Sequence, residues 1–248
     1  MSYDFANILF SGQCNLRCPY CIGQSALLQE MPDNLQVFPL AGLEPFVTAL
    51  QQHTVCQISL TGTNTDPQLY RYEARLIAYL RDRIPGVKLA LHTNGQLARK
   101  NMATFNLYDR ATISIPSFRP ETYQALTGSA RMPELRAILR TARIPIKIST
   151  ILTGRNADEI PEIIERCRAL SISRLVLRKP YNDTRQWRLF PHASPIRHFG
   201  GNPVYDIDGL EVTVWDFAAS TTRCLNLFSN GTISDEYRIA GRSHPRQV

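Results

Sequence analysis

The sequence has no hydrophobic run long enough to cross a membrane. Its longest apolar stretches, such as Ile58–Leu60 and Leu175–Leu177, are only a few residues long, whereas a transmembrane helix needs about 20 apolar residues. The first ten residues contain no basic segment followed by a long apolar one, so we expect no secretory signal. Without such a signal, a disulfide framework is not expected either. These absences predict a cytoplasmic protein with no membrane partner.

Lysine and continuous runs of charge are also scarce. The 248 residues carry a net charge of +7, with 24 Arg and only 4 Lys among the basic residues. No run of five or more charged residues occurs, so a basic tail for nucleic acid is not expected. The guanidinium group binds phosphate and carboxylate in a bidentate way. The excess of Arg therefore suits an anionic ligand, although genome composition explains it equally well.

Apolar, β-branched runs alternate with amphipathic stretches along most of the chain. Strands are expected at 5–11, 56–61, 87–93, 111–116, 146–152 and 174–178. Helices are expected between them, at 39–52, 68–84, 96–107, 120–143 and 157–171. This alternation predicts an α/β fold with a parallel sheet, either doubly wound or a partial barrel. In both architectures, ligands gather at the carboxyl ends of the strands.

The pattern changes after about residue 180. Short extended runs surround Asp208-Gly209 and Asn230-Gly231, which are signals for β-hairpins. We therefore expect a core at residues 1–180 and a short β-rich C-terminal extension at residues 181–248. This extension is predicted to cap the substrate side of the core.

Three of the six cysteines lie within eight residues. Cys14, Cys18 and Cys21 have the spacing C-x3-C-x2-C, directly after the first predicted strand. Structural zinc usually takes four protein ligands, and no second C-x2-C pair or suitably spaced His completes such a set. Iron–sulfur clusters are held by Cys thiolates, commonly four, so three would leave one iron open for chemistry. A structural zinc site and three unrelated thiols remain alternatives.

The segment CNLRCPYC, residues 14–21, resembles the signature of the radical S-adenosylmethionine (radical SAM) superfamily. The resemblance implies that Cys14, Cys18 and Cys21 hold a [4Fe–4S] cluster and that the methionine part of S-adenosylmethionine occupies the open iron. It also implies that Tyr20 lines the cofactor side. The expected fold is a partial (β/α)6 TIM-type barrel, which agrees with the six predicted strands.

Further segments resemble one branch of this superfamily in the same order. The stretch 114–165, which includes PETYQALTG, is similar to the middle of enzymes like the first radical enzyme of molybdenum-cofactor synthesis. Thr93-Asn94-Gly95 resembles the family's TNG strand end. The segment that begins at Cys224 resembles the start of the cysteine-rich extension in peptide-modifying members. The resemblance to the core spans roughly residues 5–180.

The resemblance implies that cofactor contacts lie at the strand ends. The family carries Gly-Gly-Glu-Pro after the second strand, where this chain departs from the pattern. A buried carboxylate needs hydrogen-bond donors, and hydroxyl and amide side chains supply them at the other strand ends. The residues expected at the cofactor are Tyr20, Gly62, Thr63, Asn64, Thr93, Asn94, Ser114 and Ser149. Arg178 and Lys179 end the sixth strand, where they are expected to meet an anionic substrate.

The remaining candidates have both structural and functional interpretations. Cys56 and Cys167 are expected in the core. Cys224 either donates a hydrogen atom in catalysis or is inert. A second cluster is not expected, because the spare cysteines are scattered and such a cluster needs about four ligands. His92 either lines the pocket or packs in the core. Three aromatic residues either stack on a flat substrate or pack in the core; these are Trp187, Phe190 and Trp215.

The sequence thus predicts a radical SAM enzyme with a [4Fe–4S] cluster and S-adenosylmethionine as cofactors. An electron donor such as flavodoxin or ferredoxin is its expected partner. A small molecule, anionic or nucleotide-like, is the first expected substrate, followed by a peptide and then RNA. A non-catalytic iron–sulfur scaffold remains an alternative from another class, and the altered Gly-Gly-Glu-Pro segment is its support.

Overall fold

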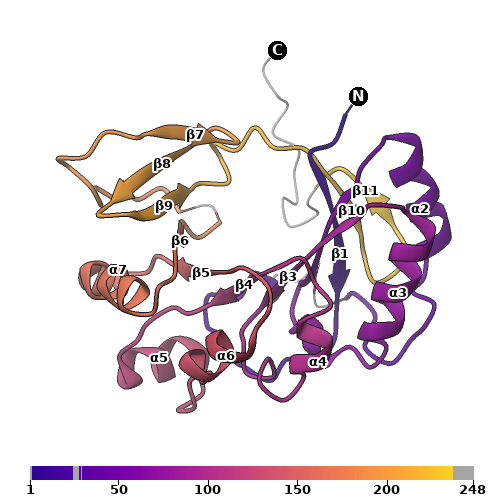
Figure 1. The fold of residues 1–248 in the computed structure, drawn as a ribbon, viewed down its shortest axis with the longest axis horizontal. Coiled ribbons are helices and arrows are strands. Elements are labelled where there is room, and N and C mark those ends of the chain that lie inside the picture. The colour runs from indigo at the N-terminus through magenta and orange to yellow at the C-terminus, as the bar shows by residue number, and fades with distance from the viewer. Residues whose placement is uncertain (1, 25–27, 29, 182, 237–248) are drawn as a thin grey trace. The chain divides into compact units, whose positions relative to one another are not determined.

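The computed structural model describes residues 2–24, 28, 30–181 and 183–236 (Figure 1). Backbone contacts divide the chain into two compact units. Unit 1 comprises residues 1–15, 21–89 and 223–248, and unit 2 comprises residues 16–20 and 90–222. Among the described residues, no helix is long and apolar enough to cross a membrane.

Unit 1 is built on a short parallel sheet. The central strand β1 pairs in parallel with β2 on one side and with β10 on the other, and β10 pairs antiparallel with β11. Five of the six residues of β1 are buried, as expected of an inner strand. The elements are β1 (Phe5–Phe10), η1 (Ile22–Gln24), α2 (Leu43–Gln52), β2 (Gln57–Gly62), η2 (Pro67–Leu69), α3 (Glu73–Arg83), β10 (Cys224–Leu227) and β11 (Ile233–Ser234).

Unit 2 contains a larger sheet, with the strand order β3-β4-β5-β6-β9-β8-β7. Strands β3 to β6 and β9 are parallel to their neighbours, while β8 and β7 are antiparallel additions. β3 (Lys88–Thr93) begins in unit 1 and continues into unit 2. The other elements are α4 (Met102–Phe105), β4 (Arg110–Ser114), α5 (Pro120–Thr127), α6 (Leu135–Thr141), β5 (Ile146–Ile151), η3 (Ala157–Glu159), α7 (Ile160–Ala169), β6 (Arg174–Arg178), β7 (Arg197–Phe199), β8 (Asn202–Ile207) and β9 (Leu210–Trp215).

The two sides of the unit 2 sheet differ in chemistry. Residues that are register partners on neighbouring strands point to the same side, and successive residues alternate. One side carries mostly apolar residues such as Ile113, Ile148 and Leu177, which are fully buried. Figure 1 shows α5, α6 and α7 along one side of these strands. The other side, called the polar face below, is defined by His92, Arg110, Thr112, Ser114, Lys147, Ser149, Arg174, Val176, Arg178, Glu211, Thr213 and Trp215.

The helices follow their apolar periodicity, with two differences from the expected ranges. In α7, the residues Ile160, Ile163, Ile164 and Cys167 are buried at three- and four-residue spacing. The helix expected at 120–143 is instead two helices, because Gly128 takes the left-handed conformation (φ 71°) that ends α5. Of the helix expected at 96–107, only α4 is helical.

The strands after residue 180 extend the sheets of both units. β9 pairs with β6 in unit 2, and β10 pairs with β1 in unit 1. Both expected hairpins are present, and Asp208 (φ 51°) and Gly209 (φ 85°) form the tight turn of the first. The domain boundary at residue 180 remains a prediction.

Two expectations about the spare cysteines have different outcomes. Cys167 is fully buried on α7, as predicted. Cys56 is exposed, so its prediction as a core residue was wrong. It lies one residue before β2 begins, where it does not share the burial of the strand.

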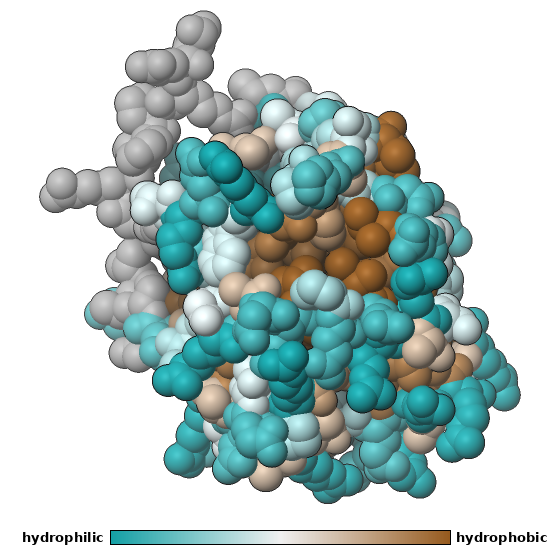
Figure 2. Space-filling model, turned by 90° about the vertical axis from the view of Figure 1, so that its left-hand side faces the viewer, coloured by the Kyte–Doolittle hydropathy of each residue, from teal (hydrophilic) through white to brown (hydrophobic). Residues whose placement is uncertain are grey.

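Figure 2 shows the side of the molecule that carries β7–β9 and α7, where hydrophobic residues gather in one area surrounded by hydrophilic ones.

Candidate functional site

The cysteine loop, residues 11–23, follows the carboxyl end of β1 in unit 1. The loop after β2 holds its first residues through side chains. The backbone N–H of Gly12 donates to Oδ1 of Asn64 at 3.0 Å, and Oγ1 of Thr65 donates to the carbonyl oxygen of Gln13 at 3.0 Å. The side chain of Asn64, predicted at the cofactor, is therefore engaged with the backbone of the cysteine loop.

Thr63 has a similar supporting role. Its backbone N–H and its hydroxyl both donate to the carbonyl oxygen of Phe10, at 2.8 and 2.9 Å. The residue is buried. These hydrogen bonds fix the segment that begins at Gly62 beside the end of β1. The backbone N–H and carbonyl groups of this loop, rather than its side chains, would therefore contact a cofactor. That contact stays a prediction.

The far end of the cysteine loop packs tightly in unit 1. A Cβ atom on Gly23 would lie 2.5 Å from Cα of Asn64 and 2.6 Å from the carbonyl oxygen of Thr63. Only glycine fits at such distances. Burial raises the pKa of the Cys21 thiol, partly offset by a hydrogen bond from the backbone of Gly23. The close approach of these loops therefore determines where Cys21 sits.

The middle of the cysteine loop, residues 16–20, is anchored to α5 in unit 2. The backbone N–H of Arg17 donates to the carbonyl oxygen of Thr127 at 2.8 Å. A Cβ atom on Gly128 would lie 3.1 Å from Cβ of Arg17. Glycine at this position therefore allows Arg17 to come close, in addition to ending the helix. The last residues of PETYQALTG, a segment to which the sequence alone assigned no role, therefore support the cysteine loop.

Tyr123 of the same segment lies near Cys18. Its hydroxyl accepts a hydrogen bond from Nε2 of Gln96 at 3.0 Å. Burial is the main cause that raises the pKa of Tyr123, and the Cys18 thiol raises it further. Sequence reasoning missed Tyr123 and Gln96, although both lie in segments that it had singled out.

The donor set of the loop fits an iron–sulfur cluster with one open iron. Cys14, Cys18 and Cys21 are all partly exposed thiols outside any disulfide. Within the described part of the chain, no three His, Cys, Asp or Glu side chains already converge as a metal site. Cys14 and Cys21 belong to unit 1, and Cys18 belongs to unit 2. Their role as the cluster ligands stays a prediction that rests on their chemistry and spacing.

Thr93 and Asn94 shape the turn after β3. Oγ1 of Thr93 accepts from the backbone N–H of Gly95 at 3.0 Å, and Oδ1 of Asn94 accepts from that of Gln96 at 3.0 Å. Thr93 is buried and pairs with Ile113, so it points to the side opposite the polar face. Its hydroxyl is therefore separated by the sheet from the predicted serines.

Ser114 and Ser149 are brought together. They are register partners on β4 and β5 and share the polar face. Ser149 is buried and Ser114 is exposed. The sheet thus places these two hydroxyls side by side, and their contact with a cofactor remains a prediction.

The two basic residues that end β6 lie in different surroundings. Nε of Arg178 donates to Oγ of Ser149 at 3.0 Å, which holds the guanidinium on the polar face. Lys179 follows Arg178 and points to the opposite side. Its Nζ lies 2.5 Å from Oδ2 of Asp216, so its charge is compensated. Of the pair predicted for substrate, Arg178 is the one that lies beside Ser149.

Sequence reasoning missed Lys147. This residue lies two positions before Ser149 and therefore on the same face of β5. Burial, followed by the charges of Arg178, Arg174 and Arg110, lowers its pKa to about 8. Burial, followed by the charges of Arg178, Lys147 and Arg110, holds the pKa of His92 well below its usual 6.5. The period-two pattern of strand β5 is the signal that would have identified Lys147.

Cys224 lies far along β1 from the cysteine loop. It pairs with Phe5 at the start of β1, whereas the loop emerges after Phe10. Five steps of about 3.3 Å separate these ends by roughly 16 Å. Burial raises the pKa of the Cys224 thiol. This position favours the inert interpretation, and the catalytic one remains untested.

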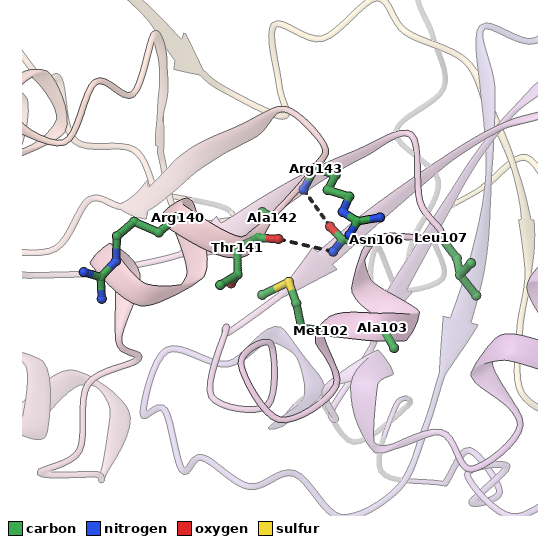
Figure 3. A pocket seen from close by; sticks show the side chains of 8 residues that line it. All are labelled: Met102, Ala103, Asn106, Leu107, Arg140, Thr141, Ala142 and Arg143. Carbon is green, nitrogen blue, oxygen red and sulfur yellow. Dashed lines mark hydrogen bonds between the residues drawn. The ribbon is translucent and has the colours of Figure 1, made fainter.

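Unit 2 also contains a pocket, whose lining side chains are shown in Figure 3. It is found where α4 and α6 end, before β4 and β5 begin, so it lies near the amino ends of the strands. Asn106 links the two segments, because its Oδ1 accepts from the backbone N–H of Arg143 at 2.7 Å and its Nδ2 donates to the carbonyl oxygen of Thr141 at 3.3 Å. None of the predicted site residues lines it.

Comparison with known proteins supplies the family. The model of the Radical SAM superfamily matches residues 8–167. Similar curated proteins include the GTP 3′,8-cyclase of Stenotrophomonas maltophilia (strain K279a), which is 28% identical over 180 residues, covering 69% of this chain and 53% of the relative. The GTP 3′,8-cyclase of Syntrophomonas wolfei is 28% identical over 198 residues, covering 75% and 58%. The chain therefore spans about half the length of the curated relatives that it matches.

Solved structures show the same fold. The structure of Streptococcus suis SuiB bound to the precursor peptide SuiA has a TM-score of 0.58 and 17% identity, covering 73% of this chain and 40% of SuiB. The structure of anSMEcpe with bound AdoMet has a TM-score of 0.51 and 16% identity, covering 75% and 56%. The predicted α/β fold with a partial barrel and antiparallel C-terminal strands is thereby confirmed.

Membership in the family determines the cofactors and the general chemistry. The family implies a [4Fe–4S] cluster and S-adenosylmethionine, and its enzymes need a reductant and a substrate. The match covers well over half of the chain, from within β1 to α7. This chain belongs to the radical SAM superfamily and is a radical SAM enzyme.

Proposed function

We propose that this radical SAM enzyme acts on a small anionic substrate that binds at the polar face of unit 2. The observation that supports this is a group of basic side chains on this face: Lys147 and Arg178 are partly buried, and their charges, with that of the exposed Arg110, add to the effect of burial in lowering the pKa of His92. Burying like charges together is costly unless an opposite charge compensates them. A bound anion would add to the opposite charge that Glu211 already brings to this face.

Part of the positive charge on this face is already balanced within the protein. Glu211 accepts from Nε of Arg174 at 2.9 Å and from a terminal nitrogen of Arg197 at 2.7 Å. Lys147 lies at the level of Arg174 in the strand register, where Glu211 partly offsets the lowering of its pKa, whereas Arg178 lies four residues further along β6. His92 is neutral at pH 7, because its pKa lies well below the usual 6.5. The ammonium of Lys147 and the guanidinium of Arg178 are the cationic groups proposed to meet a ligand anion.

The chemistry is divided between the cofactors and the chain. When bound, the cluster and S-adenosylmethionine would supply the 5′-deoxyadenosyl radical chemistry that removes hydrogen from an unreactive carbon. Cys14, Cys18 and Cys21 would hold the cluster. Ser149 holds Arg178 in place, and this pair would fix the substrate anion so that one carbon faces the radical. Flavodoxin or ferredoxin is the proposed electron donor.

The curated relatives support a nucleotide-like substrate without identifying it. Two of them are named GTP 3′,8-cyclase, and each is only about half covered by this chain. A peptide is the second candidate, favoured by the hairpin of β10 and β11 that begins at Cys224. RNA is the third, and salt-sensitive RNA binding would support it. A non-catalytic scaffold would bind a cluster but not cleave S-adenosylmethionine.

The test combines anaerobic reconstitution with binding. The loaded protein should contain about four irons and form 5′-deoxyadenosine with dithionite. It should also bind GTP, used as an anionic probe, more tightly than uncharged guanosine. Lys147→Met and Arg178→Leu should weaken GTP binding, while Lys100→Met, at an exposed position, should not. Equal binding of GTP and guanosine would contradict the anionic substrate.

A further inference from the structure

Four aromatic side chains form a continuous series in unit 2, called the aromatic row below. The ring centroids of Phe199 and Trp215 are 6.3 Å apart, those of Trp215 and Phe217 are 6.3 Å apart, and those of Phe217 and Tyr181 are 6.2 Å apart. Neighbouring rings are tilted or edge-on, at 48°, 83° and 71°. Each separation lies within the range for favourable aromatic pairs. The row therefore links β7, the end of β9 and the segment after β6.

The aromatic row is exposed to an unusual degree. Phe199 is 50% exposed and Phe217 is 40% exposed. Phe is among the residues most often buried, and neighbouring exposed apolar residues commonly mark a binding site. The other two aromatic candidates from the sequence are engaged elsewhere. Nε1 of Trp187 donates to Asp183 at 2.9 Å, and Phe190 packs against Tyr205.

Trp215 connects the aromatic row to the anion-binding residues. It is the register partner of Arg178, so both side chains start from the same face of neighbouring strands. Arg178 in turn is bonded to Ser149. Nε1 of Trp215 is buried and has no hydrogen-bond partner among the described residues. The fold thus leaves an indole donor unsatisfied beside a guanidinium that is held in place.

We propose that the aromatic row binds a planar ring of the substrate while Arg178 binds its anionic group. The substrate class is then an anion that carries a flat, conjugated ring. This inference rests on the proposed function for the position of the anion. Stacking tolerates many ring types because each has a π-face, so a nucleobase and the ring of an aromatic carboxylate share the chemistry.

The experiment is calorimetric titration of the reconstituted protein in the presence of S-adenosylmethionine. The probes are guanosine monophosphate, which has ring and anion, ribose 5-phosphate, which lacks the ring, and N-acetyltryptophan, a carboxylate with a ring. Guanosine monophosphate or N-acetyltryptophan should bind at least about fivefold more tightly than ribose 5-phosphate. The better of the two identifies the source of the ring.

Variants test whether the aromatic row causes the preference for a probe that carries a ring. Phe199→Ala and Trp215→Ala should bring the affinity for the better ring probe down to that for ribose 5-phosphate, and Trp215→Phe should restore most of the difference. Phe199 is half exposed, so its variant tests the row even where Trp215→Ala fails to fold. Trp187→Phe is the matched control and should leave the ratio of the two affinities unchanged.

Two results would overturn the inference. One is that ribose 5-phosphate binds as tightly as both ring probes. The other is that Phe199→Ala leaves the preference for the ring intact. In either case, loss of phosphate binding in Arg178→Leu would still support the proposed function. If no anion binds, or if Arg178→Leu changes nothing, the proposed function fails together with the inference.

Discussion

Replacing Lys147 by methionine should separate the stability of the protein from its ligand binding. The pKa of Lys147 is about 8 in the folded protein, against a usual 10.5, so the folded state binds this proton more weakly than the unfolded chain. Stability therefore rises with pH between about 8 and 10.5, and the cost is fully present below pH 8. At about 1.4 kcal/mol per pKa unit, this cost is about 3 kcal/mol.

Lys147→Met keeps an unbranched apolar stem and removes the charge. Its free energy of unfolding at pH 7 should therefore exceed that of the wild type by up to about 3 kcal/mol, and the gain should shrink as the pH rises from 8 toward 10.5. Urea unfolding across this pH range measures it. Lys100→Met, an exposed control, should stay within about 0.5 kcal/mol at every pH. A Lys147→Met protein that is less stable at pH 7, or whose difference does not depend on pH, would refute the reasoning.

Two further substitutions test the supports of the site. Gly23→Ala places a Cβ atom 2.5 Å from Cα of Asn64, so the iron content after reconstitution should fall well below that of the wild type. Gly154→Ala is the control, because its Cβ would meet only a side-chain nitrogen at 3.7 Å, and it should bind iron normally. Equal iron content in both variants would contradict the tight packing at Gly23. Ser149→Ala removes the hydrogen-bond acceptor of Arg178. Titration should then show that the affinity for GTP falls by about two- to tenfold, while the iron content stays unchanged. An unchanged affinity would show that the guanidinium of Arg178 needs no such support.

The strands were predictable because inner parallel strands appear as nearly continuous apolar runs. β6 begins and ends where the sequence predicted, and β1 differs by one residue. The helix ends were harder to predict, because Gly128 interrupts an otherwise amphipathic stretch. Cys56 was misjudged because burial in β2 begins only at Ile58, after an exposed first residue.

The side on which a residue points depends on strand register, which the sequence does not contain. Arg178 and Lys179 are adjacent and chemically alike, yet one is bonded to Ser149 and the other to Asp216. Lys147 was missed because a lysine in a strand suggests a solvated face. Phe199 was missed because no strand was expected where β7 lies.

The three-cysteine centre is the central claim, and single cysteine variants test it most directly. Iron content and 5′-deoxyadenosine formation should be measured after anaerobic reconstitution of Cys14→Ala, Cys18→Ala and Cys21→Ala, with Cys56→Ala and Cys224→Ala as controls. The first three should lose both the iron and the product, while the controls should keep about four irons and form 5′-deoxyadenosine. Retention of the cluster and of product formation in any of the first three variants would contradict the account.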